Sequence, residues 1–115
     1  MQPIGHISPQ EFAAAWPSSN VSSTPLAPAM LIDVREPWEF EIAHLDGATL
    51  LPLGQIYEWA QTLDKDANYV VMCHHGSRSA MACQVLQSLS FTHVTNLEGG
   101  IDAWSYAVDP KVSRY

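Results

Sequence analysis

Residues 69–79, YVVMCHHGSRS, decide the fold of this chain: a largely apolar run ends at a cysteine and continues into a polar loop. The bulky residues at 69–72 are typical of a strand that is buried on both faces of a sheet. A helical spacing of apolar residues follows the loop, at Ala82, Cys83, Leu86 and Leu89. A strand, a tight loop and a helix in this order form the repeating unit of parallel α/β sheets.

The rest of the chain continues this alternation. Apolar and β-branched segments predict further strands at 29–34, 48–51 and 93–97. Helices are expected at about 8–16, in a short segment that starts near 37, at 53–63, and in a final segment that ends near 104. The first helix carries a start signal, because Ser8, Pro9 and Glu11 fit a capping box with proline at the first helical position. The pattern predicts an α/β protein whose sheet is flanked by helices.

Length and charge narrow the possible functions. At 115 residues, one domain covering 1–115 is expected, with a flexible loop at 17–28 and a C-terminal tail at 105–115. The chain has five Lys and Arg residues and 12 Asp and Glu residues, which gives a net charge of −7. A chain with this charge is not expected to bind nucleic acid or an anionic membrane surface. No apolar stretch reaches the ~18 residues of a membrane span, and no basic residue precedes Arg35, so a cytoplasmic protein is expected.

The polar loop that begins at Cys73 is the candidate site. In open α/β sheets, ligands bind beyond the carboxyl ends of the strands. The N–H groups of such a loop and the start of the next helix can stabilise a thiolate, which makes the cysteine a nucleophile. A buried core thiol is the alternative, but the following residues offer no apolar side chain. The predicted loop residues are His74, His75, Gly76, Ser77, Arg78 and Ser79. Arg78 is the cation suited to a forked contact with an oxyanion.

In four of its sequence motifs, the chain resembles the single-domain rhodaneses, a family of sulfurtransferases. The resemblance rests on residues 31–35 (LIDVR), the turn from His44 to Ala48, the loop from Cys73 to Arg78, and residues 99–104 (GGIDAW). It implies a rhodanese-like fold around a five-stranded, mainly parallel sheet. It also implies that Cys73 carries sulfur as a persulfide, between a donor such as thiosulfate or a persulfide and a thiol, cyanide or protein acceptor. No metal and no organic cofactor are implied.

Other functions of related chains remain open. Four residues separate Cys73 from Arg78, which is the spacing of the sulfurtransferases, whereas the related cysteine phosphatases and arsenate reductases have a longer loop. Rhodanese-like domains also serve as non-catalytic or regulatory interaction modules, which commonly lack the cysteine. The presence of Cys73 disfavours such a module but leaves open a carrier that passes sulfur only to a protein partner. His74 and His75 stand where some thiosulfate-using members have Lys or Arg, so the sequence leaves the donor open.

Three further positions have expected supporting roles. Asp33 and Arg35 follow another strand near the same edge of the sheet, and a structural ion pair or loop brace is expected there. Cys83 is expected to be a packed core thiol rather than a resolving thiol. The acidic residues after Arg35 are expected on a solvated helix face: Glu36, Glu39 and Glu41.

Overall fold

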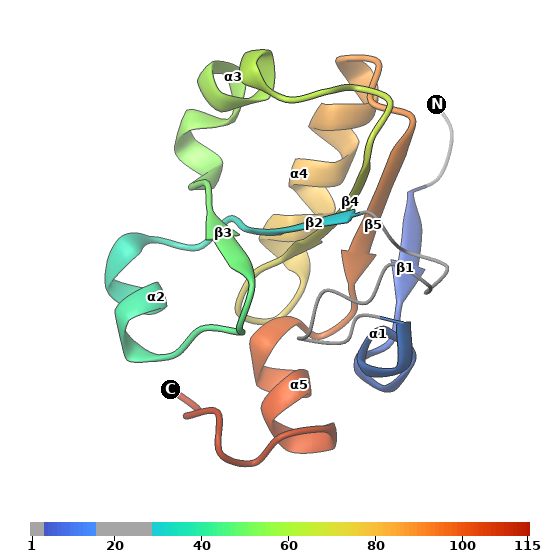
Figure 1. Ribbon diagram of the computed structural model, residues 1–115. Helices are drawn as coiled ribbons and strands as arrows, with labels where there is room; N and C mark the ends of the chain where they lie inside the picture. The colour runs from blue at the N-terminus through green and yellow to red at the C-terminus, as the bar shows by residue number, and fades with distance from the viewer. Residues whose placement is uncertain (1–3, 16–28) are drawn as a thin grey trace.

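A five-stranded, fully parallel sheet forms the centre of the computed structural model, which describes residues 4–15 and 29–115 (Figure 1). The strand order is β1-β5-β4-β2-β3. The strands are β1 (Gly5–Ile7), β2 (Ala29–Asp33), β3 (Ala48–Leu50), β4 (Asn68–Met72) and β5 (His93–Leu97). The predicted α/β fold and parallel sheet are confirmed. The edge strand β1 was not predicted, because three residues are too few to show the alternating pattern of a strand. The loop predicted at 17–28 lies outside the described residues.

Four helices lie between successive strands, and a fifth follows β5. They are α1 (Pro9–Ala15), α2 (Pro37–Ile42), α3 (Ile56–Trp59), α4 (Ser77–Ser88) and, after β5, α5 (Gly100–Ala107). The capping box of α1 is present, since Ser8 and Glu11 exchange backbone-to-side-chain hydrogen bonds of 3.1 Å. The segment predicted as one helix at 53–63 is instead divided, with the 3-10 turns η1 (Leu53–Gln55) and η2 (Ala60–Thr62) around α3. Helix α5 continues past Trp104 to Ala107, so residues 105–107 are helical rather than part of a tail.

Both faces of the sheet are buried, which explains the continuous apolar run in β4. Tyr69, Val71 and Cys73 belong to the core that includes the inner faces of α3 and α4. Val70 and Met72 point to the opposite core, which includes residues of α1 and α5. This alternation follows from the two-residue period of a strand. No helix within the described ranges, 4–15 and 29–115, has the length and apolar content needed to cross a bilayer.

The strand order brings two loops together at one edge. Strands β2 and β4 are neighbours in the sheet, with Asp33 beside Met72, and the N–H of Val34 donates to the carbonyl of Met72 at 3.0 Å. From β2 the chain continues to β3 on one side, and from β4 it continues to β5 on the other. Ligand sites of open α/β sheets lie where the connections diverge in this way. The fold therefore places the loops after Asp33 and Met72 at the expected position.

The start of α5 holds the loop after β4 from below (Figure 1). The N–H groups of Ile101 and Asp102 donate to the carbonyls of Cys73 and His74 at 2.9 and 3.1 Å. Gly100 makes this approach possible. A Cβ at Gly100 would overlap the Cys73 carbonyl oxygen and lie 2.6 Å from the His74 oxygen, and its φ of +60° is a left-handed conformation.

We expect Gly100→Ala to lower the free energy of unfolding by at least about 2 kcal/mol, because backbone overlap adds to the strain of a left-handed alanine. Urea denaturation measures this change. Gly54→Ala is the matched control, since a Cβ at Gly54 meets no atom within 4 Å. Equal stability of the two variants would show that the contact between α5 and the loop is not tight.

Candidate active site

Cys73 lies at the carboxyl end of β4 with its sulfur directed into the turn that follows. The residue is only 1% exposed. Its Sγ accepts hydrogen bonds from the N–H of Gly76 at 3.0 Å and from the hydroxyl of Ser79 at 3.4 Å. Gly76 has a φ of +103°, a left-handed conformation that bends the chain back toward the sulfur. The turn therefore directs hydrogen-bond donors at Sγ, which stabilises a negative charge on it.

The N-terminus of α4 adds to this stabilisation. The helix begins at Ser77, and the N–H of Ala80 donates to the carbonyl of Gly76 at 3.1 Å. The N–H groups of the first turn of a helix have no partner within the helix, and the helix dipole is positive there. Two groups of the predicted loop, residues 74–79, donate to Sγ: the N–H of Gly76 and the hydroxyl of Ser79.

A buried chain of polar groups leads away from the sulfur. Ser79, fully buried, also has its hydroxyl within hydrogen-bond distance of the Gly76 carbonyl (3.2 Å) and of the Asn96 side-chain oxygen. The Asn96 amide nitrogen lies 3.3 Å from Nδ1 of His6, on the edge strand. Sequence reasoning missed Asn96. The only sequence clue was an asparagine between the apolar-facing positions of a predicted buried strand. In the structure Asn96 is 4% exposed.

Arg78 is not the free cation that the sequence suggested. Its two terminal nitrogens donate to the two carboxylate oxygens of Glu39 at 2.7 and 2.9 Å. Glu39 is 3% exposed, so the expectation that it lies on a solvated helix face is wrong. The hydrogen bonds from Arg78, against the opposing effect of burial, lower the pKa of Glu39 from 4.5 to about 2. The guanidinium fork is therefore occupied within the protein.

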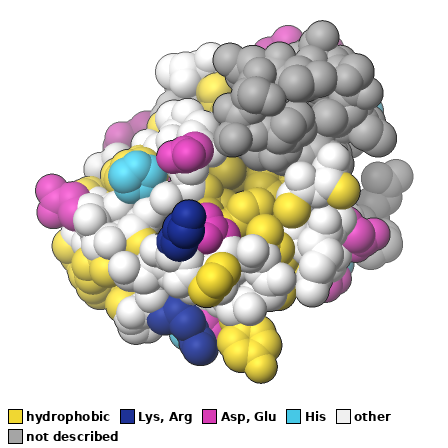
Figure 2. All heavy atoms as spheres, turned by 60° about the horizontal axis from the view of Figure 1, so that its bottom comes forward, with side chains coloured by type: hydrophobic (Ala, Val, Ile, Leu, Met, Phe, Trp, Pro, Cys, Tyr) yellow, Lys and Arg dark blue, Asp and Glu magenta, His cyan; other side chains and the backbone are white. Residues whose placement is uncertain are grey.

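Figure 2 shows the face that bears this edge of the sheet. Its dark blue basic side chains lie beside acidic ones and do not form a separate basic patch. The same hydrogen bonds to Glu39 raise the pKa of Arg78, and a negative charge on Cys73 adds a smaller effect in the same direction. The Arg78 guanidinium is therefore paired with Glu39, which neutralises its charge.

Asp33 and Arg35 form the predicted structural ion pair. Both are completely buried, and the guanidinium donates to Asp33 at 2.7 to 3.0 Å through Nη2 and Nε. Arg35 also donates to the carbonyls of Glu39 (3.2 Å) and Ala43 (2.7 Å). Burial opposes the charge, but the hydrogen bonds to Asp33 and Tyr115 outweigh it and raise the pKa of Arg35. Helix α2, and with it Glu39, is held in place by this arginine.

The C-terminal segment packs over the loop. The hydroxyl of Tyr115 accepts from Arg35 at 2.8 Å and donates to Glu39 at 2.7 Å. Its ring stacks on His74, with centroids 3.9 Å apart and planes 7° from parallel, and His74 stacks in turn on His75 at 3.9 Å. Sequence reasoning missed Tyr115, because no local pattern indicates where a terminal segment will pack.

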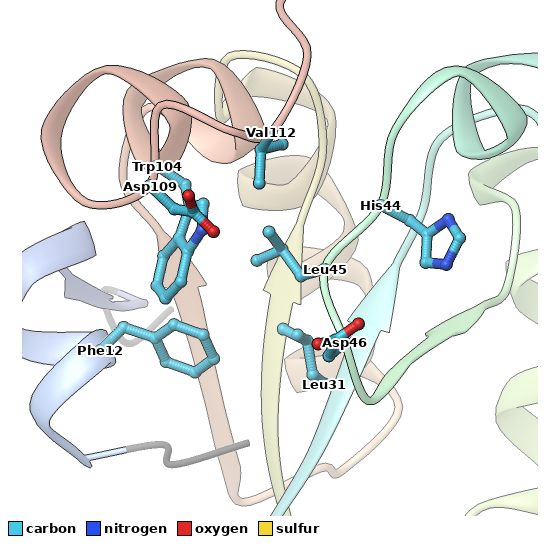
Figure 3. Close-up of a pocket in the computed structure, with 8 residues that line it drawn as sticks. All are labelled: Phe12, Leu31, His44, Leu45, Asp46, Trp104, Asp109 and Val112. Carbon is cyan, nitrogen blue, oxygen red and sulfur yellow. The ribbon is translucent and has the colours of Figure 1, made fainter.

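A hollow of ≈ 210 Å³ lies on the α1 and α5 side of the sheet (Figure 3). It is lined by Phe12, Leu31, His44, Leu45, Asp46, Trp104, Asp109 and Val112. Val112 belongs to the C-terminal segment, and Ser105 donates to its carbonyl at 2.5 Å. None of the lining residues belongs to the Cys73 loop, so this hollow is separate from the candidate site.

The second cysteine is a core residue, as expected. Cys83 lies within α4 and is completely buried among apolar side chains. Burial raises the pKa of its thiol to about 12. Cys83 therefore remains protonated at neutral pH, and a protonated thiol is a poor nucleophile.

Glu39 makes the stability of the protein sensitive to acid. Because its pKa is lowered in the folded state, its ion pair contributes stability above pH 4.5 that is lost as the pH falls toward about 2. We expect Glu39→Gln to be less stable than the unmodified protein at pH 7 and the difference to shrink over this range. Urea denaturation between pH 7 and 2.5 measures it. A difference that is constant with pH would contradict the ion pair.

Comparisons with known proteins agree with this geometry. The family model for the rhodanese-like domain matches residues 11–107. The chain is 44% identical over 91 residues to rhodanese-like/PpiC domain-containing protein 12, chloroplastic, of Arabidopsis thaliana, a match of 76% of this chain but 30% of that protein. It is 42% identical over 81 residues to YtwF of Bacillus subtilis, which is named a sulfurtransferase, a match of 70% of this chain and 78% of that one.

A solved structure shows the same fold. The rhodanese-like domain protein from Staphylococcus aureus superposes with a TM-score of 0.77 and 24% identity, over 97% of this chain and 99% of that one. The chain spans less than a third of the length of its Arabidopsis relative, so the resemblance concerns the domain and not that whole protein. The family model, which covers most of the chain, and the geometry of the Cys73 loop lead to one conclusion: the chain belongs to the rhodanese-like domain family.

Proposed function

We propose that this protein is a sulfurtransferase in which Cys73 carries the transferred sulfur as a persulfide. The observation that carries the proposal is the Cys73 sulfur itself, buried at the start of α4 and hydrogen-bonded by Gly76 and Ser79. A sulfur anion gains most from such donors in a site that excludes water. Family membership and a relative named as a sulfurtransferase support the same reaction class.

The reaction is a double displacement without net oxidation. The Cys73 thiolate attacks the outer sulfur of the donor, the donor's sulfur–sulfur bond breaks, and its electron pair leaves with the departing group, which is sulfite for thiosulfate or a thiolate for a persulfide. The resulting Cys73 persulfide anion occupies the cradle of residues 74–79. An acceptor thiolate or cyanide then attacks the outer sulfur, and Cys73 returns as the thiolate.

The pairing of Arg78 favours a persulfide donor over thiosulfate. Thiosulfate brings two negative charges to a site where a thiolate is already present, so it needs a free cation. Arg78 directs both of its terminal nitrogens to Glu39. Burial lowers the pKa of His74, so this ring is neutral at pH 7 and supplies no charge in its place. A donor with less negative charge meets no such repulsion.

Sulfur loading should occur on one cysteine. After incubation with a persulfide donor or thiosulfate, peptide mass spectrometry is expected to find one added sulfur on Cys73. Cys73→Ser should abolish turnover, whereas Cys83→Ala should retain most of it because the Cys83 thiol is buried and protonated. A folded Cys83→Ala variant without activity would overturn the single-cysteine mechanism. A protein that loads sulfur but transfers it to no small acceptor would instead be a carrier module.

The preference between donors should depend on Glu39. Removing its charge by Glu39→Gln frees the guanidinium of Arg78, and we expect the KM for thiosulfate to fall about fivefold, equivalent to ~1 kcal/mol of added attraction in a solvated site. The KM for a neutral persulfide donor should change little. Glu41→Gln is the matched control, because Glu41 is exposed on the same helix. A higher KM for thiosulfate in Glu39→Gln would mean that the ion pair itself presents Arg78 to the donor.

A further inference from the structure

Two histidines and a carboxylate converge beside the Cys73 loop. His74 and His75 come from the loop, and Asp102 comes from the first turn of α5. One ligand atom from each lies within 4.8 Å of the other two. The closest charged contact among them is between Nε2 of His75 and a carboxylate oxygen of Asp102, at 3.9 Å. Neither imidazole side chain reacts in the sulfur transfer described above.

His74 carries a ring nitrogen whose hydrogen-bonding capacity is not used. Its Nε2 is buried and has no hydrogen-bond partner among the described residues. A buried polar atom without a partner destabilises the folded state, so a ligand that binds this atom would remove that penalty. A neutral imidazole nitrogen of this kind is a common ligand for metal ions.

The backbone holds the three side chains near one another. The N–H of Asp102 donates to the carbonyl of His74 at 3.1 Å, and the close approach at Gly100 fixes α5 against the loop. Tyr115 stacks on the outer face of the pair of rings. One group competes for the carboxylate, because Nε of Arg114 donates to Asp102 at 2.9 Å.

We propose that His74, His75 and Asp102 form a binding site for a divalent transition metal ion of the zinc class at the entrance to the Cys73 loop. Two imidazoles and one carboxylate suit Zn²⁺, Co²⁺ or Ni²⁺, and they leave coordination positions open for water. Metal–ligand bonds of about 2.0 to 2.1 Å require ligand atoms about 3.4 Å apart. The ligand atoms, which lie within 4.8 Å of one another, must therefore move closer by at most about 1.4 Å, and the pair from His75 and Asp102, 3.9 Å apart, by less. The His75 side chain is 65% exposed and free to make this movement.

Metal binding can be measured without any sulfur chemistry, so this inference does not rest on the proposed function. The background is the full chain with Cys73→Ser, which removes the reactive thiol as a competing ligand. Zn²⁺ is titrated by calorimetry at pH 7.5, and Co²⁺ is followed by its visible absorption. We expect one ion per chain. His75→Ala and Asp102→Asn should each weaken binding by at least about tenfold, since loss of even an outer partner of a metal ligand has effects of this size.

Two further variants separate this site from other surface histidines. Arg114→Gln should tighten Zn²⁺ binding, because it releases Asp102 from a competing ion pair. His93→Ala is the matched control and should leave the affinity unchanged, since His93 is exposed on β5 and is not in the cluster. The proposal is overturned if no saturable binding occurs, or if His75→Ala binds as tightly as the control. Affinity that does not rise in Arg114→Gln would remove Asp102 from the ligand set.

Discussion

The buried ion pair between Arg35 and Asp33 is the interaction on which the rest of the site depends. Both groups are completely buried, so neither charge could remain there without the other. Removing one partner of such a pair costs about 3 to 5 kcal/mol, mostly because the remaining charge stays buried and unpaired. Arg35 also donates hydrogen bonds to the carbonyl of Glu39, within α2, and to the carbonyl of Ala43, directly after α2. The pair at the end of β2 therefore determines where α2 lies.

From this position, α2 determines the electrostatics of the Cys73 loop. Glu39 reaches across to Arg78, and Tyr115 closes the network by bonding to both Glu39 and Arg35. The loop cation is neutralised within the protein rather than presented to solvent. In the proposed mechanism, the N–H of Gly76 and the hydroxyl of Ser79, rather than Arg78, stabilise an anion at Cys73. Such fixed dipoles need no reorganisation when the charge develops.

The other side of the loop is held by α5. The N–H groups of Ile101 and Asp102 donate to the carbonyls of Cys73 and His74, while the N–H of Gly76 donates to the sulfur. The same contact places Asp102 beside the histidine pair. One close approach, possible only because residue 100 is a glycine, thus serves both the sulfur cradle and the proposed metal site.

The sequence by itself determined the alternation of strands and helices, the position of Cys73 at a strand end, and the burial of Cys83. These features follow from the local spacing of apolar residues and from the residues that allow a loop to bend. Both depend only on residues a few positions apart in the sequence. The sequence pattern also identified Asp33 and Arg35 as a brace, because they are two residues apart at one strand end.

Only the tertiary structure decided the partners of the site residues. Glu39 looked like part of an acidic, solvated run, yet it is buried because Arg78 neutralises it from another loop. Asn96, Asp102 and Tyr115 reach the loop from β5, α5 and the C-terminal segment. Local sequence carries no record of such contacts, since they arise when parallel strands bring distant segments to one edge of the sheet. Electrostatics and hydrogen bonding act through space, so the chemistry of Cys73 depends on neighbours that its own sequence motif does not contain.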